Sequence, residues 1–414
     1  MSDLLFLAHR IPWPPDKGDK IRSWRLLDHL LGRGWRVHLG AFVDDPADMA
    51  HEAHLAARCA SVFLQPIRPA QRPWRGMKAL LGGVSLSQAF YHDARMHDWV
   101  ARTVAAHDVR AVVGFSGQMA PYLLAHADGR ATIMDLVDMD SAKWGQYAAE
   151  TAGPKRWLFA REARRLLELE RAVAARADAT LFVSEAEARL FRSHAPEAAD
   201  RVRAVPNGVD MDYFDPDAGF PRQPVERYAL DGQIVTFVGA MDYRPNAEGI
   251  AWFAREAWPA VRRARPGARL FVVGGKPPAE VQALLGRDGI TVTGRVADVR
   301  PYIAAARAVV APLRIARGVQ NKVLEAMAMA RPVVATPQAF EGIDAEPGRH
   351  LLVEAEADGM AAQVSRLLGD PASGQALGRA ARARCLAQYR WSTNLSLLDG
   401  LLGGPSPARE REAA

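Results

Sequence analysis

The side chains best suited to chemistry in this sequence lie in one stretch, which joins an apolar run at 308–311 to a helical pattern beginning at about Gly318. The amino end of a helix carries unpaired N–H groups and a partial positive charge, so it can bind an anion. The same stretch supplies cations and side-chain amides, namely Arg314, Arg317, Gln320, Asn321 and Lys322. This combination predicts a site for a phosphate-bearing ligand at the start of the helix.

Lys322 and Glu325 are three residues apart, so they lie on one face of the predicted helix. A lysine suits a phosphate, and a carboxylate one turn later can accept hydrogen bonds from two neighbouring sugar hydroxyls. The pair therefore suits a nucleotide diphosphate, with its ribose at Glu325 and its phosphates toward Gly318. A simple surface ion pair between the two side chains would have the same spacing. Spacing alone leaves both alternatives open.

The run from Lys322 to Ala335 resembles the nucleotide-sugar helix of retaining GT-B glycosyltransferases of family 4. That family usually has two glutamates eight positions apart. Glu325 matches the second, which the resemblance implies binds the donor ribose, and Arg317 stands where the first is expected. The form Arg-Gly-x-Gln-Asn-Lys is similar to a subgroup of sugar transferases found with bacterial exopolysaccharide and PEP-CTERM systems. We therefore interpret the site as a variant of the family site.

The chain of 414 residues is longer than a single hydrophobic core usually becomes, so two domains are expected. Its 49% hydrophobic and 24% charged residues are typical of a globular protein. The net charge of +6 favours anionic partners, but the basic residues are dispersed and no nucleic-acid-binding motif accompanies them. Cys59 and Cys385 have no spacing that suggests a disulfide framework or a zinc site.

The amino terminus lacks the features of a signal peptide, and no apolar run approaches the roughly 18 residues of a membrane span. A cytoplasmic location is the expectation. Two segments combine cations with tryptophan or aliphatic side chains, which fits contact with anionic lipid at the inner face of the cytoplasmic membrane. They are Arg68–Lys78 and the Arg-rich helix predicted at Pro154–Arg176. A solvated basic loop is the alternative for the first of them.

Short apolar strands alternate with helical patterns in two successive runs, which predicts an α/β protein with two Rossmann-like domains. We expect an N-terminal acceptor domain at 1–214 and a C-terminal nucleotide-sugar donor domain at 225–389, facing each other across a cleft as in the GT-B fold. The Pro-Asn-Gly-Val-Asp element at 206–210 resembles the one that ends the first domain in the family. The resemblance also implies that a helix at about 390–402 returns to the N-terminal domain. Residues 403–414 are expected to form a disordered tail.

The first predicted strand, Leu4–Ala8, is followed by a proline-rich loop and a helix start that contains Lys17, Gly18 and Lys20. Glycine gives the backbone freedom, and the lysines supply cations at a helix amino end. The resemblance implies that this loop, with Gly18, contacts the donor phosphate or the acceptor. Loops of this composition are also common connectors without a binding role.

An acidic group follows the strand predicted at Ala131–Val137, and its best-placed members are Asp138 and Asp140. Ligands of parallel α/β folds lie beyond the carboxyl ends of the strands, so these carboxylates are candidates to contact acceptor hydroxyls or the transferred hexose. Binding of a divalent cation, or capping of the next helix by Asp140 or Ser141, would account for them equally. The family often has a histidine near this point, and Asp138 matches it only in approximate position.

The segment Phe237–Asn246 resembles a strand-to-loop element that usually reads Phe-Val-Gly-Arg in the family, with a later lysine. Ala240 replaces that arginine, and the lysine has no clear equivalent. Arg244 is the candidate that would supply a cation to the donor diphosphate.

The combined interpretation is a hexosyltransferase that moves a sugar from a nucleotide diphosphate sugar to an acceptor hydroxyl of a lipid-linked saccharide or a growing exopolysaccharide. Lys322, Arg317 and Gly318 would stabilise the departing diphosphate. Glu325 would fix the ribose, and Asp138 would orient the acceptor or the hexose. Retention of configuration is implied by the resemblance alone, and neither a metal nor a cofactor is required because fixed cations can meet the phosphate charge. A GT-B nucleotide-sugar 2-epimerase and a non-catalytic nucleotide-sugar sensor are the alternatives.

Overall fold

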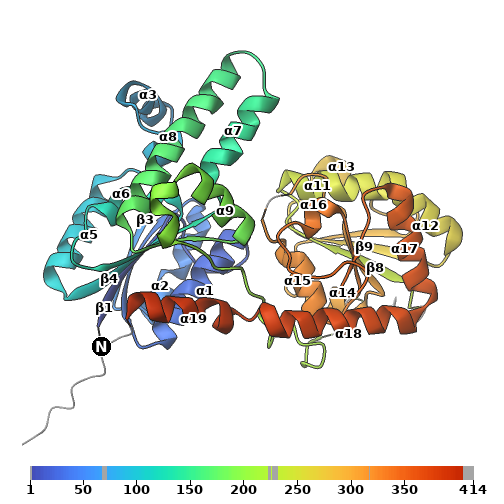
Figure 1. The fold of residues 1–414 in the computed structure, drawn as a ribbon. Helices are drawn as coiled ribbons and strands as arrows, with labels where there is room; N and C mark the ends of the chain where they lie inside the picture. The colour runs from blue at the N-terminus through green and yellow to red at the C-terminus, as the bar shows by residue number, and fades with distance from the viewer. Residues whose placement is uncertain (1, 68–71, 222–224, 226–231, 317, 404–414) are drawn as a thin grey trace, which may run out of the picture. The chain divides into compact units, whose positions relative to one another are not determined.

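The computed structural model describes residues 2–67, 72–221, 225, 232–316 and 318–403. These residues form two compact units (Figure 1). The first runs to Pro206 and takes up the chain again from Leu395, and the second is Asn207–Asn394. Each unit is an α/β fold built on one parallel sheet, as the alternating strand and helix patterns predict.

In the described part of the first unit, seven parallel strands form a sheet in the order β3-β2-β1-β4-β5-β6-β7. They are β1 Asp3–Ala8, β2 Arg36–Val43, β3 Ser61–Pro66, β4 Val109–Phe115, β5 Ala131–Val137, β6 Ala179–Phe182 and β7 Val202–Ala204. Every residue of β1 is buried, as expected for an inner strand of a parallel sheet covered on both faces. The strand order reverses between β1 and β4, so the loops that follow these strands diverge at the carboxyl edge, where such folds bind ligands.

Helices of the first unit fill the connections between these strands. They are α1 Gly18–Gly32, α2 Glu52–Ala56, α3 Arg72–Gly82, α4 Leu86–Phe90, α5 Ala94–Ala106, α6 Ala120–Leu124, α7 Asp140–Glu150, α8 Pro154–Arg176, α9 Glu185–His194 and the part of α19 (Trp391–Leu402) from Leu395 onward. The carboxylate of Asp399 in α19 pairs with His29 Nε2 at 2.9 Å and with Arg33 Nη2 at 2.5 Å. These contacts join α19 to α1.

A buried ion pair fixes α1 to the first sheet. Arg22 of α1 is 1% exposed, and its Nε donates to Oδ2 of Asp135 in β5 at 2.8 Å. Its Nη1 also donates to the carbonyl oxygen of Val205 at 2.8 Å. Burial raises the pKa of Asp135, and the Arg22 guanidinium opposes that rise. The pair therefore positions the start of α1, which begins at Gly18.

In the described part of the second unit, six parallel strands form a sheet in the order β10-β9-β8-β11-β12-β13. They are β8 Ile234–Val238, β9 Arg269–Val273, β10 Ile290–Gly294, β11 Ala308–Ala311, β12 Val333–Ala335 and β13 Leu352–Val353. The helices are α11 Arg244–Trp252, α12 Trp258–Ala264, α13 Ala279–Gln282, α14 Arg300–Ala305, α15 Asn321–Ala328, α16 Pro337–Phe340, α17 Ala357–Gly369 and α18 Pro371–Gln388. The order reverses between β8 and β11, the position at which such folds bind ligands at the carboxyl edge of the sheet.

Backbone segments approach one another closely at this edge. A Cβ on Gly274, after β9, would lie 1.8 Å from the carbonyl oxygen of Gly239, after β8. A Cβ on Gly249 of α11 would lie 2.6 Å from the carbonyl oxygen of Pro312, after β11. Only glycine fits at Gly274 and Gly249, so the carboxyl ends of β8, β9 and β11 are tightly packed together.

Replacing Arg22 by alanine is expected to destabilise the first unit by about 3–5 kcal/mol, because the Asp135 carboxylate would remain buried without a counter-charge. Urea unfolding followed by far-ultraviolet circular dichroism measures this loss. The double variant Arg22→Met, Asp135→Leu removes both charges and should recover most of the stability. Arg110→Ala breaks the exposed 3.0 Å pair with Asp108 and serves as the control, with an expected loss below about 1 kcal/mol. Equal losses for Arg22→Ala and Arg110→Ala would contradict the role of the buried pair.

Candidate active site

The predicted phosphate-binding stretch lies at the carboxyl edge of the second sheet, between β11 and α15. Gly318 has a φ of 67°, a left-handed conformation that glycine adopts easily and that a right-handed helix excludes. The helix predicted from about Gly318 therefore begins only at Asn321, which corrects the sequence-based start. Gln320 precedes it in an extended conformation, and the first N–H groups of α15 have no acceptor within the helix.

Lys322 occupies the first turn of α15, and its ammonium is held by a second helix. Its Nζ donates a hydrogen bond to Oδ1 of Asn246 in α11 and lies 5.5 Å from the ring centroid of Phe237 in β8. Asn246 is 4% exposed, and its Nδ2 donates to the Ala240 carbonyl oxygen at 2.7 Å. Burial lowers the pKa of Lys322 to about 8, although the Glu325 carboxylate acts in the opposite sense. The second unit thus fixes a cation beside the amino end of α15.

Glu325 lies one turn further along α15 and is partly buried. Burial raises the pKa of its carboxyl group to about 7, while Lys322 opposes the rise. Within the described ranges, no ion pair joins Lys322 to Glu325, because the ammonium bonds to Asn246 instead. The simple surface ion pair that their spacing allows is therefore not formed. A carboxylate in this position can bind sugar hydroxyls.

Two side-chain amides shape the loop before α15. Nε2 of Gln320 donates to the Gly318 carbonyl oxygen at 3.2 Å, and Oδ1 of Asn321 accepts from Nδ2 of Asn207 at 3.3 Å. The carbonyl oxygen of Asn207 in turn accepts from Nδ2 of Asn394 at 3.3 Å. The Pro-Asn-Gly element therefore contributes Asn207 to the start of α15. The sequence pattern identified this element but did not predict its contact with Asn321, nor the hydrogen bond between Asn246 and Lys322.

Other predicted cations make different contacts. Arg244 begins α11, but its side chain is 82% exposed and its Nε donates to Oε1 of Glu248 at 2.6 Å. The exposed guanidinium of Arg314 lies 4.9 Å from the ring centroid of Trp252. Arg317 lies outside the described residues. Contact of Arg244 or Arg317 with a diphosphate therefore stays a prediction.

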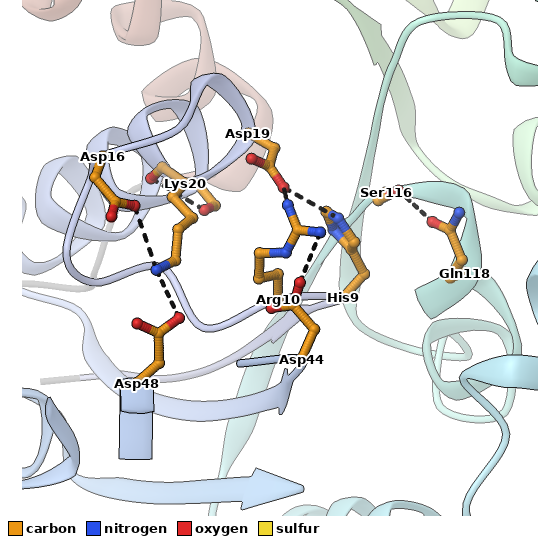
Figure 2. A network of polar contacts seen from close by, with 10 residues as sticks. His9, Arg10, Asp16, Asp19, Lys20, Asp44, Asp48, Ser116 and Gln118 are labelled. Atoms are coloured by element: carbon orange, nitrogen blue, oxygen red, sulfur yellow. Dashed lines mark hydrogen bonds and ion pairs between the residues drawn. The ribbon is translucent and has the colours of Figure 1, made fainter. Parts of the chain in front are cut away.

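At the carboxyl edge of the first sheet, ion pairs hold the loop between β1 and α1, as Figure 2 shows. Arg10 pairs with Asp19 and, at 2.9 Å, with Asp44. Burial acts to raise the pKa of Asp19, but His9, whose Nε2 lies 3.4 Å away, and Arg10 hold that pKa well below its usual range. Gly18 is the exposed first residue of α1, and a Cβ on it would meet no atom within 4 Å. The loop is therefore clamped, with open space beside Gly18.

Lys20 has a structural role in this clamp. Its side chain is 2% exposed, and Nζ lies 2.8 Å from the Asp48 carboxylate and 3.5 Å from that of Asp16 (Figure 2). These two carboxylates neutralise the Lys20 ammonium, which the sequence pattern suggested as a phosphate-binding cation. One sequence feature could have indicated these ion pairs. Asp19 lies in the first turn of α1, and Arg10 lies in the loop before it.

Asp138 follows β5 at the same edge, directly after Val137, whose φ is 69°. Its Oδ1 is buried and has no hydrogen-bond partner among the described residues. Burial, Glu187 and Asp140 together raise the pKa of Asp138 to about 6. Buried oxygens in proteins normally accept a hydrogen bond, and a ligand hydroxyl at the end of the strand would provide one for Oδ1 of Asp138.

The other interpretations of this acidic group fit the structure less well. The residue before α7 is Met139, which makes no side-chain cap, and the N–H of Ser141 donates to Oε1 of Glu170 at 3.0 Å. Capping of α7 by Asp140 or Ser141 is therefore not observed. In the part of the chain that the structure covers, Asp138 and Asp140 do not converge with a third potential metal ligand.

Some predictions concern segments that are only partly described. Residues 68–71 of the basic segment lie outside the described residues, and its continuation forms α3. The predicted tail lies outside them from residue 404. No helix within the described ranges has the length and apolar character needed to cross a bilayer.

Comparison with known proteins yields two family matches and a set of relatives. Residues 21–213 match Glycosyltransferase Family 4, and residues 232–370 match Glycosyl transferases group 1. A relative from Mycobacterium tuberculosis strain H37Rv is the GDP-mannose-dependent alpha-(1-6)-phosphatidylinositol monomannoside mannosyltransferase. It is 29% identical over 337 residues, which cover 77% of this chain and 80% of the relative.

Solved structures with the same fold cover nearly the whole chain. Sucrose-phosphate synthase from Thermosynechococcus elongatus has a TM-score of 0.70 at 20% identity, covering 97% of this chain and 98% of its own. Anabaena HepE in complex with UDP-glucose has a TM-score of 0.64 at 16% identity, covering 97% of this chain and 100% of its own. These neighbours are GT-B glycosyltransferases, which confirms the predicted α/β fold class. The two family matches, taken with this fold, show that the chain is a glycosyltransferase with a family 4 region followed by a group 1 region.

Proposed function

We propose that this glycosyltransferase takes its sugar from a nucleotide diphosphate sugar bound at the start of α15. The observation that carries the proposal is the Lys322 ammonium, fixed by Asn246 at a helix amino end, one turn before a partly buried Glu325 that forms no ion pair with it. Relatives support the donor class, because one is named as GDP-mannose-dependent and another was solved with UDP-glucose. Residues 225–389 would then form the donor domain and residues 1–214 the acceptor domain.

In this proposal, each group has a separate task. Lys322, the first N–H groups of α15 and the backbone at Gly318 bind the diphosphate and stabilise the charge that develops as it leaves. Glu325 accepts hydrogen bonds from the ribose hydroxyls, which aligns the anomeric carbon. Arg317, which precedes Gly318 in the sequence, and Arg244, at the start of α11, would add positive charge. Since these groups meet the phosphate charge, the proposed reaction uses neither a metal nor a cofactor.

The proposed reaction proceeds with retention of the anomeric configuration. On a front-face path the departing phosphate oxygen takes the proton of the acceptor hydroxyl, while the bond from the anomeric carbon to that phosphate breaks and the bond to the acceptor oxygen forms. No nucleophile from the protein is then needed. The buried, unpartnered Oδ1 of Asp138 would accept a hydrogen bond from the hexose or the acceptor and hold it in position.

We further propose that the acceptor is a lipid-linked saccharide or a growing exopolysaccharide at the inner face of the cytoplasmic membrane. The mycobacterial relative supports a lipid acceptor, because its name specifies a phosphatidylinositol mannoside. The Arg-Gly-x-Gln-Asn-Lys form supports the exopolysaccharide subgroup. The 2-epimerase and sensor alternatives are less favoured, since the relatives named above are transferases or synthases. Deuterium uptake into the sugar would indicate the epimerase, and donor binding without turnover would indicate the sensor.

Replacing Glu325 by alanine is expected to weaken donor binding by about 1.5–3 kcal/mol, which is typical of lost hydrogen bonds to a charged group. Calorimetric titration with UDP, GDP, ADP and their common sugar conjugates measures this loss and identifies the base. Glu280→Ala removes an exposed carboxylate from α13 and should leave the affinity unchanged. Unaltered affinity in Glu325→Ala would show that the ribose binds elsewhere.

Donor affinity should depend on pH because both Glu325 and Lys322 change their charge near neutral pH. Glu325 must be ionised and is protonated below about pH 7, whereas Lys322 must be protonated and loses its proton above about pH 8. Binding of the intact nucleotide sugar should therefore weaken as the pH falls through 7 or rises through 8. Glu325→Gln should abolish the acidic limb and keep the basic one. A profile that is flat from pH 6 to 9 in the wild type would rule out these two groups as donor ligands.

Replacing Asp138 by asparagine should slow transfer by about 100-fold while donor affinity stays the same, because the substrate would be misplaced rather than lost. Initial rates at saturating donor measure the slowing. Proton NMR of the freshly formed product should show the donor's anomeric configuration in both proteins. An inverted product would overturn the front-face path, and an unchanged rate would remove Asp138 from the site.

A further inference from the structure

The hairpin formed by α7 and α8 exposes aromatic side chains near its turn. Trp157 in the first turn of α8 is 63% exposed, and Tyr147 in α7 is 42% exposed. Tyr147 forms a cluster with Trp144 and Phe159, because the ring centroid of Trp144 lies 5.9 Å from that of Tyr147 and 5.3 Å from that of Phe159. This cluster bridges the two helices, and Trp157 adds a separate exposed ring near the turn.

Exposed cations stand beside these rings. Lys155 and Arg156 precede Trp157 directly, and both lie on the surface. Neither forms an ion pair within the described ranges, where the nearby Glu150 carboxylate accepts instead from Nε2 of Gln146 at 3.0 Å. The end of the hairpin therefore combines large amphipathic rings with unneutralised positive charge.

Buried charged residues hold the hairpin rigidly in the first unit. Glu170 of α8 is 3% exposed, and its carboxylate accepts from the N–H and the hydroxyl of Ser141 at the start of α7, at 3.0 and 2.5 Å. Nη2 of Arg161 donates to the Ala79 carbonyl oxygen of α3 at 2.8 Å. Glu162 accepts from the N–H of Leu86, the first residue of α4, at 2.7 Å. Buried polar side chains of α8 thus contact three other helices, and Figure 1 shows α7 running alongside α8.

The anchored helix α3 extends the same kind of surface. Trp74, Met77 and Leu80 of α3 are 61%, 53% and 41% exposed, and Val84 just after it is 39% exposed. Large exposed apolar patches on a soluble protein mark interaction sites. Tryptophan and tyrosine beside lysine and arginine are typical of the boundary between lipid headgroups and acyl chains, whereas lysine is depleted in protein–protein interfaces.

We propose that the hairpin tip, defined as Trp144, Tyr147, Lys155, Arg156, Trp157 and Phe159, docks on an anionic lipid bilayer. The rings of Trp157 and Tyr147 enter the boundary between headgroups and acyl chains, and Lys155 and Arg156 bind lipid phosphates. Docking in this way would hold the first unit at the membrane without a spanning helix. The inference deepens the proposed membrane-linked acceptor but is tested without any acceptor.

The test measures binding of the full-length protein to vesicles of phosphatidylcholine with and without phosphatidylglycerol, by co-sedimentation. Trp157→Ala with Tyr147→Ala should weaken binding to the anionic vesicles by about tenfold or more, because apolar contact with the bilayer is lost. Lys155→Ala with Arg156→Ala should weaken it by roughly 25-fold, since each cation near an anionic surface contributes about fivefold. The charge variant should have no such effect on vesicles of phosphatidylcholine alone.

Matched controls change similar side chains elsewhere. Leu285→Ala removes an apolar side chain that is 58% exposed in the second unit, and Arg102→Ala with Arg110→Ala removes two exposed cations from the first. Both controls should bind vesicles as the wild type does. Equal vesicle binding by the wild type and the tip variants would overturn the proposal. So would a tip variant that keeps vesicle binding but loses an oligomer on size-exclusion chromatography, because the tip would then be an interface between copies.

Donor titration of the same variants separates this proposal from the proposed function. Tip variants that bind the nucleotide sugar normally but fail on vesicles would support lipid docking in a correctly folded protein. If no nucleotide sugar binds to any protein while the tip variants still lose vesicle binding, the donor assignment fails and lipid docking stands.

Discussion

The candidate donor site of the second unit depends on the hydrogen bond that the partly buried ammonium of Lys322 donates to Asn246. A partly buried charge costs free energy unless it is hydrogen-bonded, and Asn246 provides that bond while its own amide is tied to the Ala240 carbonyl oxygen. The bond links α15 to α11 and to the loop after β8. Close backbone packing at Gly274 and Gly249 holds these segments together. A cation is therefore fixed at a helix amino end before any ligand arrives, so a bound anion would meet little reorganisation.

In the first unit, too, buried charges are satisfied by polar partners, but the candidate site residue there is an acid. Arg22 and Asp135 neutralise each other inside the unit, and the clamp around Arg10 and Asp19 fixes the loop after β1. Asp138, a few residues beyond Asp135, keeps a buried oxygen without a partner. Paired charges thus build the scaffold, and Asp138 leaves an unpartnered oxygen at the carboxyl edge of the sheet, where a substrate would use it.

Much of the fold follows from sequence patterns, because local signals determine it. The strand at Ala131–Val137 and the helix at Pro154–Arg176 have the predicted bounds, set by a short apolar run and by a proline at a helix start. The predicted start of α15 at about Gly318 was wrong, because hydrophobic periodicity does not reveal that Gly318 has a positive φ. The partner of Lys322 is 76 residues distant, so no local pattern contains it. The displaced pKa values of the site come from burial, which spacing does not encode.

The most direct test of this account is phosphorus-31 NMR of a nucleotide sugar that binds the protein, recorded for the wild type, Lys322→Met and Asn246→Ala. The account predicts that both diphosphate resonances shift on binding to the wild type. Lys322→Met should abolish most of that shift, and Asn246→Ala should reduce it because the ammonium is no longer held in place. Identical resonances in all three complexes would contradict the placement of the diphosphate at the start of α15.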